Sequence, residues 1–407
     1  MKGVRKLLPL TSLMLWMTTS SFINLGVSTE GDDLSASSFS PFEVADLDTK
    51  ELKNQCPTNK KYHREGPIFF GSALFWKANE TGLTYAATSR RHTKTDPLLG
   101  KAEISKLDFN WDYGFKVGIG AEIPHGGWDT TLSYTWFRDK ADGKTNSPQR
   151  GVLIPQLISS AKNTATFAAG NSAGQVVDTT YLMQGFSVSQ AQAKWKLHLN
   201  VLDWDLGRQL VLFKWLSLRP FVGVKASWID QDYDIYYNNY TKFTEPKYTP
   251  ENITVKQKCD YWGVGPMAGL QTQFWLRHGF SIYGNAAISL VYGQFDVKHR
   301  EVSDFDLSNQ PIVDTKLMYY AARAITDMQL GLRWDSSHCK TKKAGRCKCD
   351  KGIDRMNFSV AIGWDQHLFF EQNQFLKFND VSNPSNFVQG SDALSVQGGT
   401  ISLRLDF

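Results

Sequence analysis

The feature that most constrains this chain is an alternation of apolar and polar side chains over unusually long segments. Between Trp111 and Ala121 every second residue is apolar, and the residues between them are charged or glycine. Successive side chains of a β-strand point to opposite faces, so this segment is predicted to be a strand with one apolar and one polar face. The same alternation returns at residues 128–136, 216–228, 280–292, 358–364 and 401–407.

The length of the predicted strands separates two classes of all-β protein. The strands are predicted at residues 68–77, 108–122, 127–138, 190–206, 216–235, 258–276, 280–299, 317–335, 355–370 and 394–407. Many exceed the roughly 9–11 residues that a tilted strand needs to cross a bilayer, whereas strands of soluble proteins are most often about 5–6 residues long. We therefore predict an all-β fold, a transmembrane antiparallel up-and-down β-barrel of about 10–12 strands.

The connections between these strands alternate in length. Those after the first, third, fifth, seventh and ninth strands are long, at residues 78–107, 139–189, 236–257, 300–316 and 371–393. Three of the others are short, at residues 123–126, 207–215 and 277–279. Outer-membrane barrels have short periplasmic turns and longer outer loops. The pattern predicts a Gram-negative outer membrane and a periplasmic N-terminus, with connection 336–354 as an exception because it is long on the periplasmic side.

The N-terminus has the layout of a secretory signal peptide. Basic residues at Lys2, Arg5 and Lys6 precede a short apolar core and a small, polar end. Cleavage is expected after Ser28, with a site near Ser20 as the alternative. The expected parts are a signal peptide at 1–28, a periplasmic lead-in at 29–66 and the barrel at 67–407.

Composition and motifs exclude several functions. The net charge of +5 is small for 407 residues, and no basic face with interleaved aromatic residues indicates nucleic-acid binding. The eight histidines show no spacing to a nucleophile that would mark a catalytic pair. We expect a protein that is not an enzyme and that needs no cofactor or metal.

The last residues form a second export-related signal. Ile401, Leu403, Leu405 and Phe407 share one face, and the chain ends in an aromatic residue. This resembles the signal by which the barrel-assembly machinery recognises a final strand, although an ordinary amphipathic strand can also end in phenylalanine. The expected partners are therefore outer-membrane lipids and the barrel-assembly machinery.

Several glycine- and aromatic-rich stretches resemble one bacterial family. They are GFKVGIGAEIPHGGWDTTLSYTWF at 114–137, LDWDLGRQLVLFKWLSLRPFVGVKASWI at 202–229, YWGVGPMAGLQ at 261–271, SIYGNAAISLVYGQF at 281–295, QLGLRWD at 329–335 and LSVQGGTISLRLDF at 394–407. In these stretches and their order the chain resembles the Legionella-type major outer membrane protein family, whose MOMP-like, pore-forming members also occur in Chlamydia-related bacteria. The resemblance implies a barrel with porin-like activity and brings no catalytic motif.

The polar faces of the strands supply the candidate lumen residues. By alternation, the charged side chains expected to line the lumen are Asp112, Lys116, Lys194, Lys196, Arg219, Lys225, Arg323, Asp327, Arg333 and Arg404. Charges that line a pore set its ion selectivity, and the excess of cations in this set predicts a mild anion preference. The alternative is that salt bridges fill the lumen, because small barrels can be packed shut.

Five cysteines in an exported chain indicate disulfide chemistry. The candidates are Cys56, Cys339, Cys347 and Cys349, and Cys259 is expected at the outer end of the barrel. The odd number leaves at least one cysteine without an intrachain partner. Disulfide-linked envelope proteins are therefore possible partners. Zinc is the weaker alternative for the cluster that begins at His338, since the spacing lacks a CxxC pair.

Three functions remain open from the sequence. The leading hypothesis is a porin-like channel for the passive diffusion of small hydrophilic solutes through a polar lumen. The second is a closed, surface-exposed barrel that acts as an adhesin through the loop 139–189. The third is a structural envelope protein held by disulfides. Stepwise conductance in a planar bilayer would separate the first from the others.

Overall fold

The computed structural model describes residues 66–89, 102–123, 127–149, 151–158, 186–213, 215–242, 251–304, 311–336, 357–378 and 387–407. Every regular element within these residues is a β-strand. In the described part of the chain, no helix is long and apolar enough to cross a membrane. The predicted signal peptide and nearly all of the lead-in lie outside the described residues, so their boundaries remain predictions.

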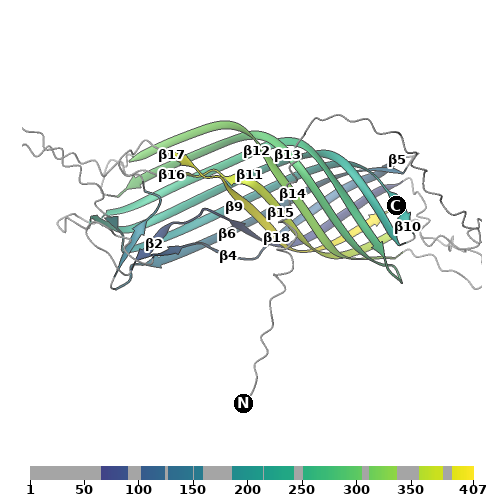
Figure 1. The fold of residues 1–407 in the computed structure, drawn as a ribbon, viewed down its shortest axis with the longest axis horizontal. Helices are drawn as coiled ribbons and strands as arrows, with labels where there is room; N and C mark the ends of the chain where they lie inside the picture. Colours follow the sequence, from purple (N-terminus) through teal and green to yellow (C-terminus); the bar gives the residue numbers. More distant parts are fainter. Residues whose placement is uncertain are drawn as a thin grey trace, which may run out of the picture. The chain divides into compact units, whose positions relative to one another are not determined.

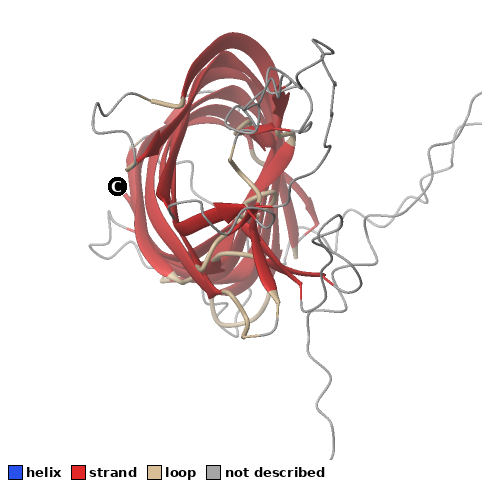
Figure 2. Cartoon of the chain, turned by 90° about the vertical axis from the view of Figure 1, so that its left-hand side faces the viewer, coloured by secondary structure: helices blue, strands red, loops and turns tan. Residues whose placement is uncertain are grey.

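Ten long strands form a closed antiparallel barrel, which confirms the predicted fold (Figure 1; Figure 2). They are β1 (Pro67–Glu80), β5 (Asp112–Ile123), β6 (Trp128–Asn146), β9 (Gln190–Arg208), β11 (Leu216–Lys242), β12 (Glu251–Trp275), β13 (Phe280–Ser303), β14 (Val313–Asp335), β15 (Asn357–Asn373) and β18 (Asp392–Asp406). Each pairs with the next along the chain, and β18 pairs with β1, with Leu405 opposite Phe69. Closure gives every one of these strands two neighbours toward the periplasmic end, whereas residues 313–324 at the outer end of β14 pair with β13 and not with β15.

Shorter strands extend or fill the barrel. The strands β2 (Ala86–Ser89), β3 (Ala102–Ser105) and β7 (Val152–Pro155) form a separate sheet, and β16 (Leu376–Phe378) pairs with β17 (Phe387–Gln389). Brief pairings with the barrel strands come from β4 (Asp108–Phe109), β8 (Phe186–Ser187) and β10 (Leu210–Phe213). The end of the barrel near β2, β16 and β17, on the left in Figure 1, holds these described strands of the predicted connections 78–107 and 371–393. We call it the outer end, because outer-membrane barrels place their longer loops outside the cell.

Several strands run further toward the outer end than the sequence predicts. β6 continues to Asn146 instead of ending at 138, β11 continues to Lys242 instead of 235, and β12 begins at Glu251 instead of 258. Part of the predicted loop 139–189 is therefore strand. The predicted strands end where the outward face stops being apolar. In the structure the strand pairing continues beyond the membrane, where apolar residues face inward and polar residues face outward.

β9 shows this exchange within one strand. Toward the periplasmic end, Trp204 points outward and is 54% exposed, while Asp205 points inward and is buried. Toward the outer end, Trp195 and Leu197 point inward and are fully buried, while Lys194, Lys196 and His198, which alternate with them, face outward. Within the membrane the apolar side chains of β9 face outward, because the surrounding medium is lipid. Above the membrane they face inward, because the surrounding medium is water.

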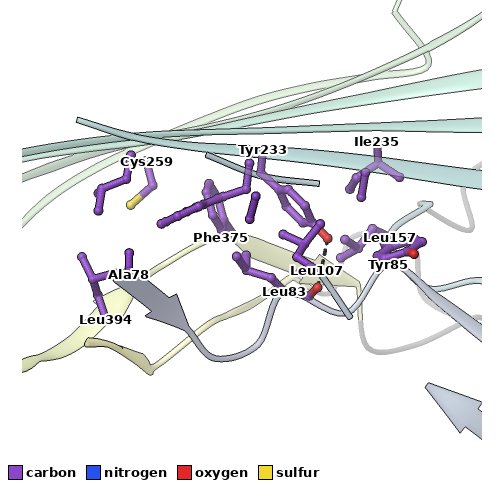
Figure 3. Packing of buried hydrophobic residues seen from close by; sticks show 14 of the residues in the cluster. Ala78, Leu83, Tyr85, Leu107, Leu157, Tyr233, Ile235, Cys259, Phe375 and Leu394 are labelled. Carbon is purple, nitrogen blue, oxygen red and sulfur yellow. Dashed lines mark hydrogen bonds between the residues drawn. The ribbon is translucent and has the colours of Figure 1, made fainter. Parts of the chain in front are cut away.

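The exchange creates a dry apolar cluster inside the outer half of the barrel, which we call the outer core (Figure 3). Its members of valine size or larger are Leu74, Trp76, Leu83, Tyr85, Leu107, Phe137, Leu153, Leu157, Val188, Trp195, Leu197, Leu199, Val201, Ile229, Tyr233, Ile235, Tyr237, Tyr240, Ile253, Val255, Tyr261, Val291, Phe295, Val297, Ile325, Phe369, Phe375, Leu376, Leu394 and Val396. Strand residues of the wall thus pack against connecting segments that fold into the barrel.

Hydrogen bonds hold these segments to the wall. Tyr233 Oη donates to the carbonyl oxygen of Leu83 at 3.2 Å (Figure 3), and Tyr237 Oη donates to that of Tyr85 at 2.6 Å. On the other side, Gln257 Nε2 donates to the carbonyl oxygen of Leu376 at 2.7 Å. Buried backbone groups of the inserted segments are therefore satisfied by the wall, as a packed interior requires.

The final residue closes the barrel seam at the periplasmic end. The Phe407 ring meets the Phe69 ring edge-on at 5.8 Å, and the Phe407 amide donates to the carbonyl oxygen of Pro67 at 3.2 Å. We predict that Phe407→Ser lowers the amount of folded protein in the outer membrane several-fold, as measured by unboiled gel migration of isolated membranes. Phe69→Ser is the control, because it removes the same ring contact but keeps the terminal signal. Equal losses in both variants would refute a role in recognition.

Candidate functional site

A cavity of about 140 Å³ lies inside the membrane-spanning part of the barrel. Its polar and charged lining residues are Ser72, Lys116, Ser133, Thr135, Asp203, Asp205, Lys225, Gln271, Asn285, Asp327, Gln329, Asp365, His367 and Thr400. They project from the inward faces of strands whose outward faces are apolar, which is the alternation of a lipid-embedded barrel. The polar lumen is thus a direct consequence of the period-two pattern.

Lys225 holds a network of ion pairs across this cavity. Its Nζ lies 2.6 Å from Asp203 Oδ1 and 3.2 Å from Asp327 Oδ2. Asp327 Oδ1 in turn lies 2.6 Å from His367 Nδ1. Lys225 belongs to β11 and Asp327 to β14, which are separated along the wall by β12 and β13. The pair therefore spans the lumen and does not merely join neighbouring strands.

A second cluster surrounds Arg219, six residues nearer the periplasmic start of β11. Its Nε lies 2.8 Å from Asp129 Oδ1, and its Nη2 lies 2.6 Å from Asp205 Oδ1. Thr131 also donates a hydrogen bond to Asp205. Two carboxylates around one guanidinium use its planar set of donors and fix its position.

Trp76 bounds the cavity on the side of the outer core. Its indole nitrogen donates to Thr400 Oγ1 at 3.1 Å, and Thr400 Oγ1 donates to Asp365 at 2.6 Å. The ring lies 5.6 Å from that of Phe137 and 4.8 Å from that of His367, measured between centroids. The indole thus has an apolar body in the outer core and a polar edge in the lumen.

Eight of the ten predicted lumen residues occupy inward-facing positions in their strands. They are Asp112, Lys116, Arg219, Lys225, Arg323, Asp327, Arg333 and Arg404. The prediction was wrong for Lys194 and Lys196, which face outward while Trp195 between them is buried inside. The rule that polar residues face the lumen holds only within the bilayer, and these two lysines lie beyond it.

Most of the inward cations are neutralised. Besides the two clusters, Arg323 pairs with Glu371 at 2.7 Å, Arg333 with Asp335 at 2.8 Å, and Arg404 with Asp406 at 2.7 Å. Lys116 lines the cavity and has no ion pair among the described residues. Of the carboxylate partners the prediction named only Asp327. It did not name the others, which are Asp129, Asp203, Asp205, Asp335, Glu371 and Asp406. Alternation alone would have found Asp203 and Asp205, which flank the outward Trp204.

A buried carboxyl group lies above the cavity, at the outer end of β1. The Glu80 side chain is buried beside Gln231, and burial raises the pKa of Glu80 well above its usual range although Gln231 lowers it. The folded protein therefore holds this proton more tightly than the unfolded chain does. Its contribution to stability is full at low pH and is lost as the pH rises above about 4.3, the ordinary value for Glu.

We predict that Glu80→Gln removes part of the fall in stability as the pH rises above about 4.3, because glutamine keeps the shape of the protonated acid and cannot titrate. Urea unfolding of the barrel in detergent at a series of pH values measures this difference. Glu103→Gln in β3 is the control, since Glu103 is exposed. A parallel pH dependence in the Glu80 variant and the parent would contradict the assignment.

The structure places only one of the cysteines. Cys259 is a free thiol buried in the outer core, and burial raises its pKa. The disulfide candidates Cys56, Cys339, Cys347 and Cys349 lie outside the described residues, so cross-linking stays a prediction. No group of three or more potential metal ligands occurs among the residues that the structure describes.

Comparisons with known proteins identify the family. Two solved structures resemble the fold at a distance. The outer membrane protease OmpT of Escherichia coli has 11% identity and a TM-score of 0.36, over 86% of this chain and 100% of that one. A major outer membrane protein of Thermus thermophilus has 12% identity and a TM-score of 0.23, over 84% and 99%. No curated protein matches the chain.

The family match is far more specific than these structural likenesses. The model of the family described as Legionella pneumophila major outer membrane protein precursor matches residues 67–407. These residues are the whole predicted barrel, and they include every strand described above. The chain therefore belongs to the Legionella major outer membrane protein family and is a protein of the Gram-negative outer membrane.

Proposed function

We propose that the protein is a channel for the passive diffusion of small hydrophilic solutes and that the structure represents its closed state. The cavity of about 140 Å³ with its charged lining, in the middle of the membrane-spanning wall, carries this proposal. Charged side chains that only occupied the interior would cost stability compared with apolar packing. A lumen that conducts water and ions, by contrast, needs charged and polar side chains along its wall.

Two features restrict the path in this state. The Lys225–Asp327 pair narrows the lumen within the membrane, and the outer core closes the barrel above it. A solute can pass only when the inserted segments move. Phe375 and Leu376 bring the hairpin β16–β17 into the outer core, and in the described part of the chain β16 and β17 pair with each other and not with a strand of the wall. We therefore assign the outer gate to the hairpin β16–β17.

The gate can be removed with little disturbance of the wall. A Cβ atom built at Gly390 would lie 2.9 Å from the carbonyl oxygen of Asn373, so residues 373 and 390 are close in space. Deleting residues 374–389 and joining the ends by two glycines should leave the barrel intact. In planar bilayers we expect the deletion variant to show stepwise conductance several-fold above that of the parent. Val388→Ser in the retained hairpin is the control.

The charges around the cavity also set the expected selectivity. Its lining contains Lys116 and Lys225 against Asp203, Asp205, Asp327 and Asp365. Carboxylates outnumber the cations here, so we now expect a mild cation preference in place of the anion preference predicted from the sequence. Reversal potentials of the deletion variant in asymmetric salt measure it.

A second function is favoured by the outer core itself. Strands that continue beyond the bilayer around a packed apolar interior form a rigid support for the outer connections, as an adhesin or a structural envelope protein requires. The same recordings separate the two proposals. If neither the parent nor the deletion variant conducts, the channel is refuted and the closed barrel stands.

A further inference from the structure

Basic residues gather on the outward face of β6 and β9, above the membrane-spanning wall. Arg138 and Lys140 point outward from β6, and Lys196 points outward from β9. Lys140 lies directly opposite Lys196 in the strand register. Like charges opposite one another destabilise a sheet, so the fold gains nothing from this arrangement.

These three cations lack the carboxylate partners that similar residues have elsewhere on the barrel, although Arg138 Nη1 donates to the backbone carbonyl oxygens of Phe137 and Leu199 at 3.1 and 3.4 Å. Among the described residues none of them forms an ion pair, and Asp232, which lies opposite Lys196 on β11, is held by Lys258 at 2.9 Å. On the wall formed by β13 and β14, by contrast, Lys298 and Lys316 both pair with Asp296, at 3.4 and 3.3 Å. Carboxylates also lie on this face, since Asp142 is the next outward residue of β6 and Asp230 of β11 lies opposite His198. None of the three cations is ion-paired with them in the described part of the chain, so these cations remain available to an external anion.

The patch lies at the height of lipid headgroups. Trp136 points outward two residues before Arg138 on β6, and the Arg138 guanidinium lies 5.0 Å from the centre of the Trp136 ring. Two residues of a strand span about 7 Å. Outward aromatic residues mark the interface of a membrane with water, so Arg138 and Lys140 reach the layer where phosphate groups lie.

An apolar groove lies in the wall below the patch. It has a volume of about 760 Å³ and is lined by residues of β1, β5, β6, β9 and β18, including Ala73, Ile119, Tyr134 and Leu202. Tyr134 and Leu202 are opposite each other on the two strands that carry the patch. Gly71 also lines the groove, and a Cβ atom there would meet no other atom within 4 Å, so the groove is empty at that point.

We propose that this wall binds a phosphorylated lipid of the outer leaflet. Arg138, Lys140 and Lys196 hold its phosphate, and an acyl chain lies in the groove past Tyr134 and Leu202. The three positive charges favour a negatively charged headgroup. The apolar groove below them favours a lipid, which carries acyl chains, over a soluble phosphate, which has none. The site is on the outside of the barrel and is independent of the proposed channel.

The experiment uses the purified full-length barrel in neutral detergent, with three probes. Phosphatidic acid carries phosphate and acyl chains, phosphatidylcholine of the same chains has no net charge, and inorganic phosphate has no chains. Binding is followed by native mass spectrometry and by the shift in melting temperature. We expect one molecule of phosphatidic acid to bind saturably to each barrel. We expect no binding of phosphatidylcholine or of inorganic phosphate.

Three variants test the residues. Each lysine near a membrane surface contributes about a fivefold factor to anionic lipid binding, so K140Q/K196Q should weaken phosphatidic acid binding about 30-fold. Gly71→Leu should weaken it by filling the groove, without steric conflict in the wall. K298Q/K316Q is the matched control and should bind as the parent does.

Four outcomes would overturn the proposal. They are equal binding of phosphatidylcholine, equal stabilisation by inorganic phosphate, unchanged binding in K140Q/K196Q, and equal weakening in K298Q/K316Q. The lysine variants remain foldable, because each replaces an outward side chain in water by a neutral one of similar length. Unboiled gel migration of every variant confirms a closed barrel before lipid is added.

Discussion

Lys225→Met is expected to destabilise the barrel by about 3–5 kcal/mol, which is the usual cost of removing one partner from a buried ion pair. Lys225 is 3% exposed and contacts both Asp203 and Asp327. Without it, two carboxylates remain in the lumen with only His367 to offset the charge of Asp327. The free energy of unfolding, measured in urea with the barrel in detergent micelles, gives the loss.

Lys116→Met is the matched control for this variant. Lys116 lines the same cavity but makes no ion pair among the described residues, so its loss should cost less than about 1 kcal/mol. Adding Asp203→Asn and Asp327→Asn to Lys225→Met should restore much of the stability, because removing both partners of a buried pair is often nearly neutral. If Lys225→Met costs no more than Lys116→Met, the network does not hold the lumen together.

The second large effect is expected in the outer core. Trp195→Ala should lower the free energy of unfolding by about 3–5 kcal/mol, the usual cost of a cavity left by a large aromatic residue. Trp195 is fully buried, its ring lies 5.4 Å from that of Phe109, and its indole nitrogen donates to Gln231 Oε1 at 3.1 Å. The variant thus leaves both a cavity and a buried amide oxygen without its donor.

Lys196→Ala provides the comparison within the same strand. Lys196 is the next residue of β9 but points outward and is exposed, so its loss should change stability in detergent by less than about 0.5 kcal/mol. The same urea titrations measure both variants. Similar losses at 195 and 196 would mean that the outer end of the barrel is not a packed core.

The membrane-spanning half of the barrel was predictable from the sequence. Between Trp111 and Ala121 the alternation has one physical cause, since one side of the strand meets lipid and the other meets the polar lumen. The antiparallel order, the closed barrel and the inward position of Lys116, Lys225 and Asp327 follow from that pattern, which left the number of strands open between 10 and 12. The family follows from the glycine- and aromatic-rich stretches of the same strands.

Only the tertiary structure decided what fills the barrel. Trp195 and Lys196 alternate as regularly as Trp204 and Asp205, but a strand's own pattern does not say where the membrane ends and which face is then inside. That depends on the connecting segments with Leu83 and Phe375, which fold back into the lumen and make its outer half apolar. The pairing of Lys225 with Asp327 likewise joins residues 102 positions apart, counted as 327 minus 225. Such a contact is set by barrel closure and shear, because the local alternation of β11 and β14 places both side chains inside but not opposite one another.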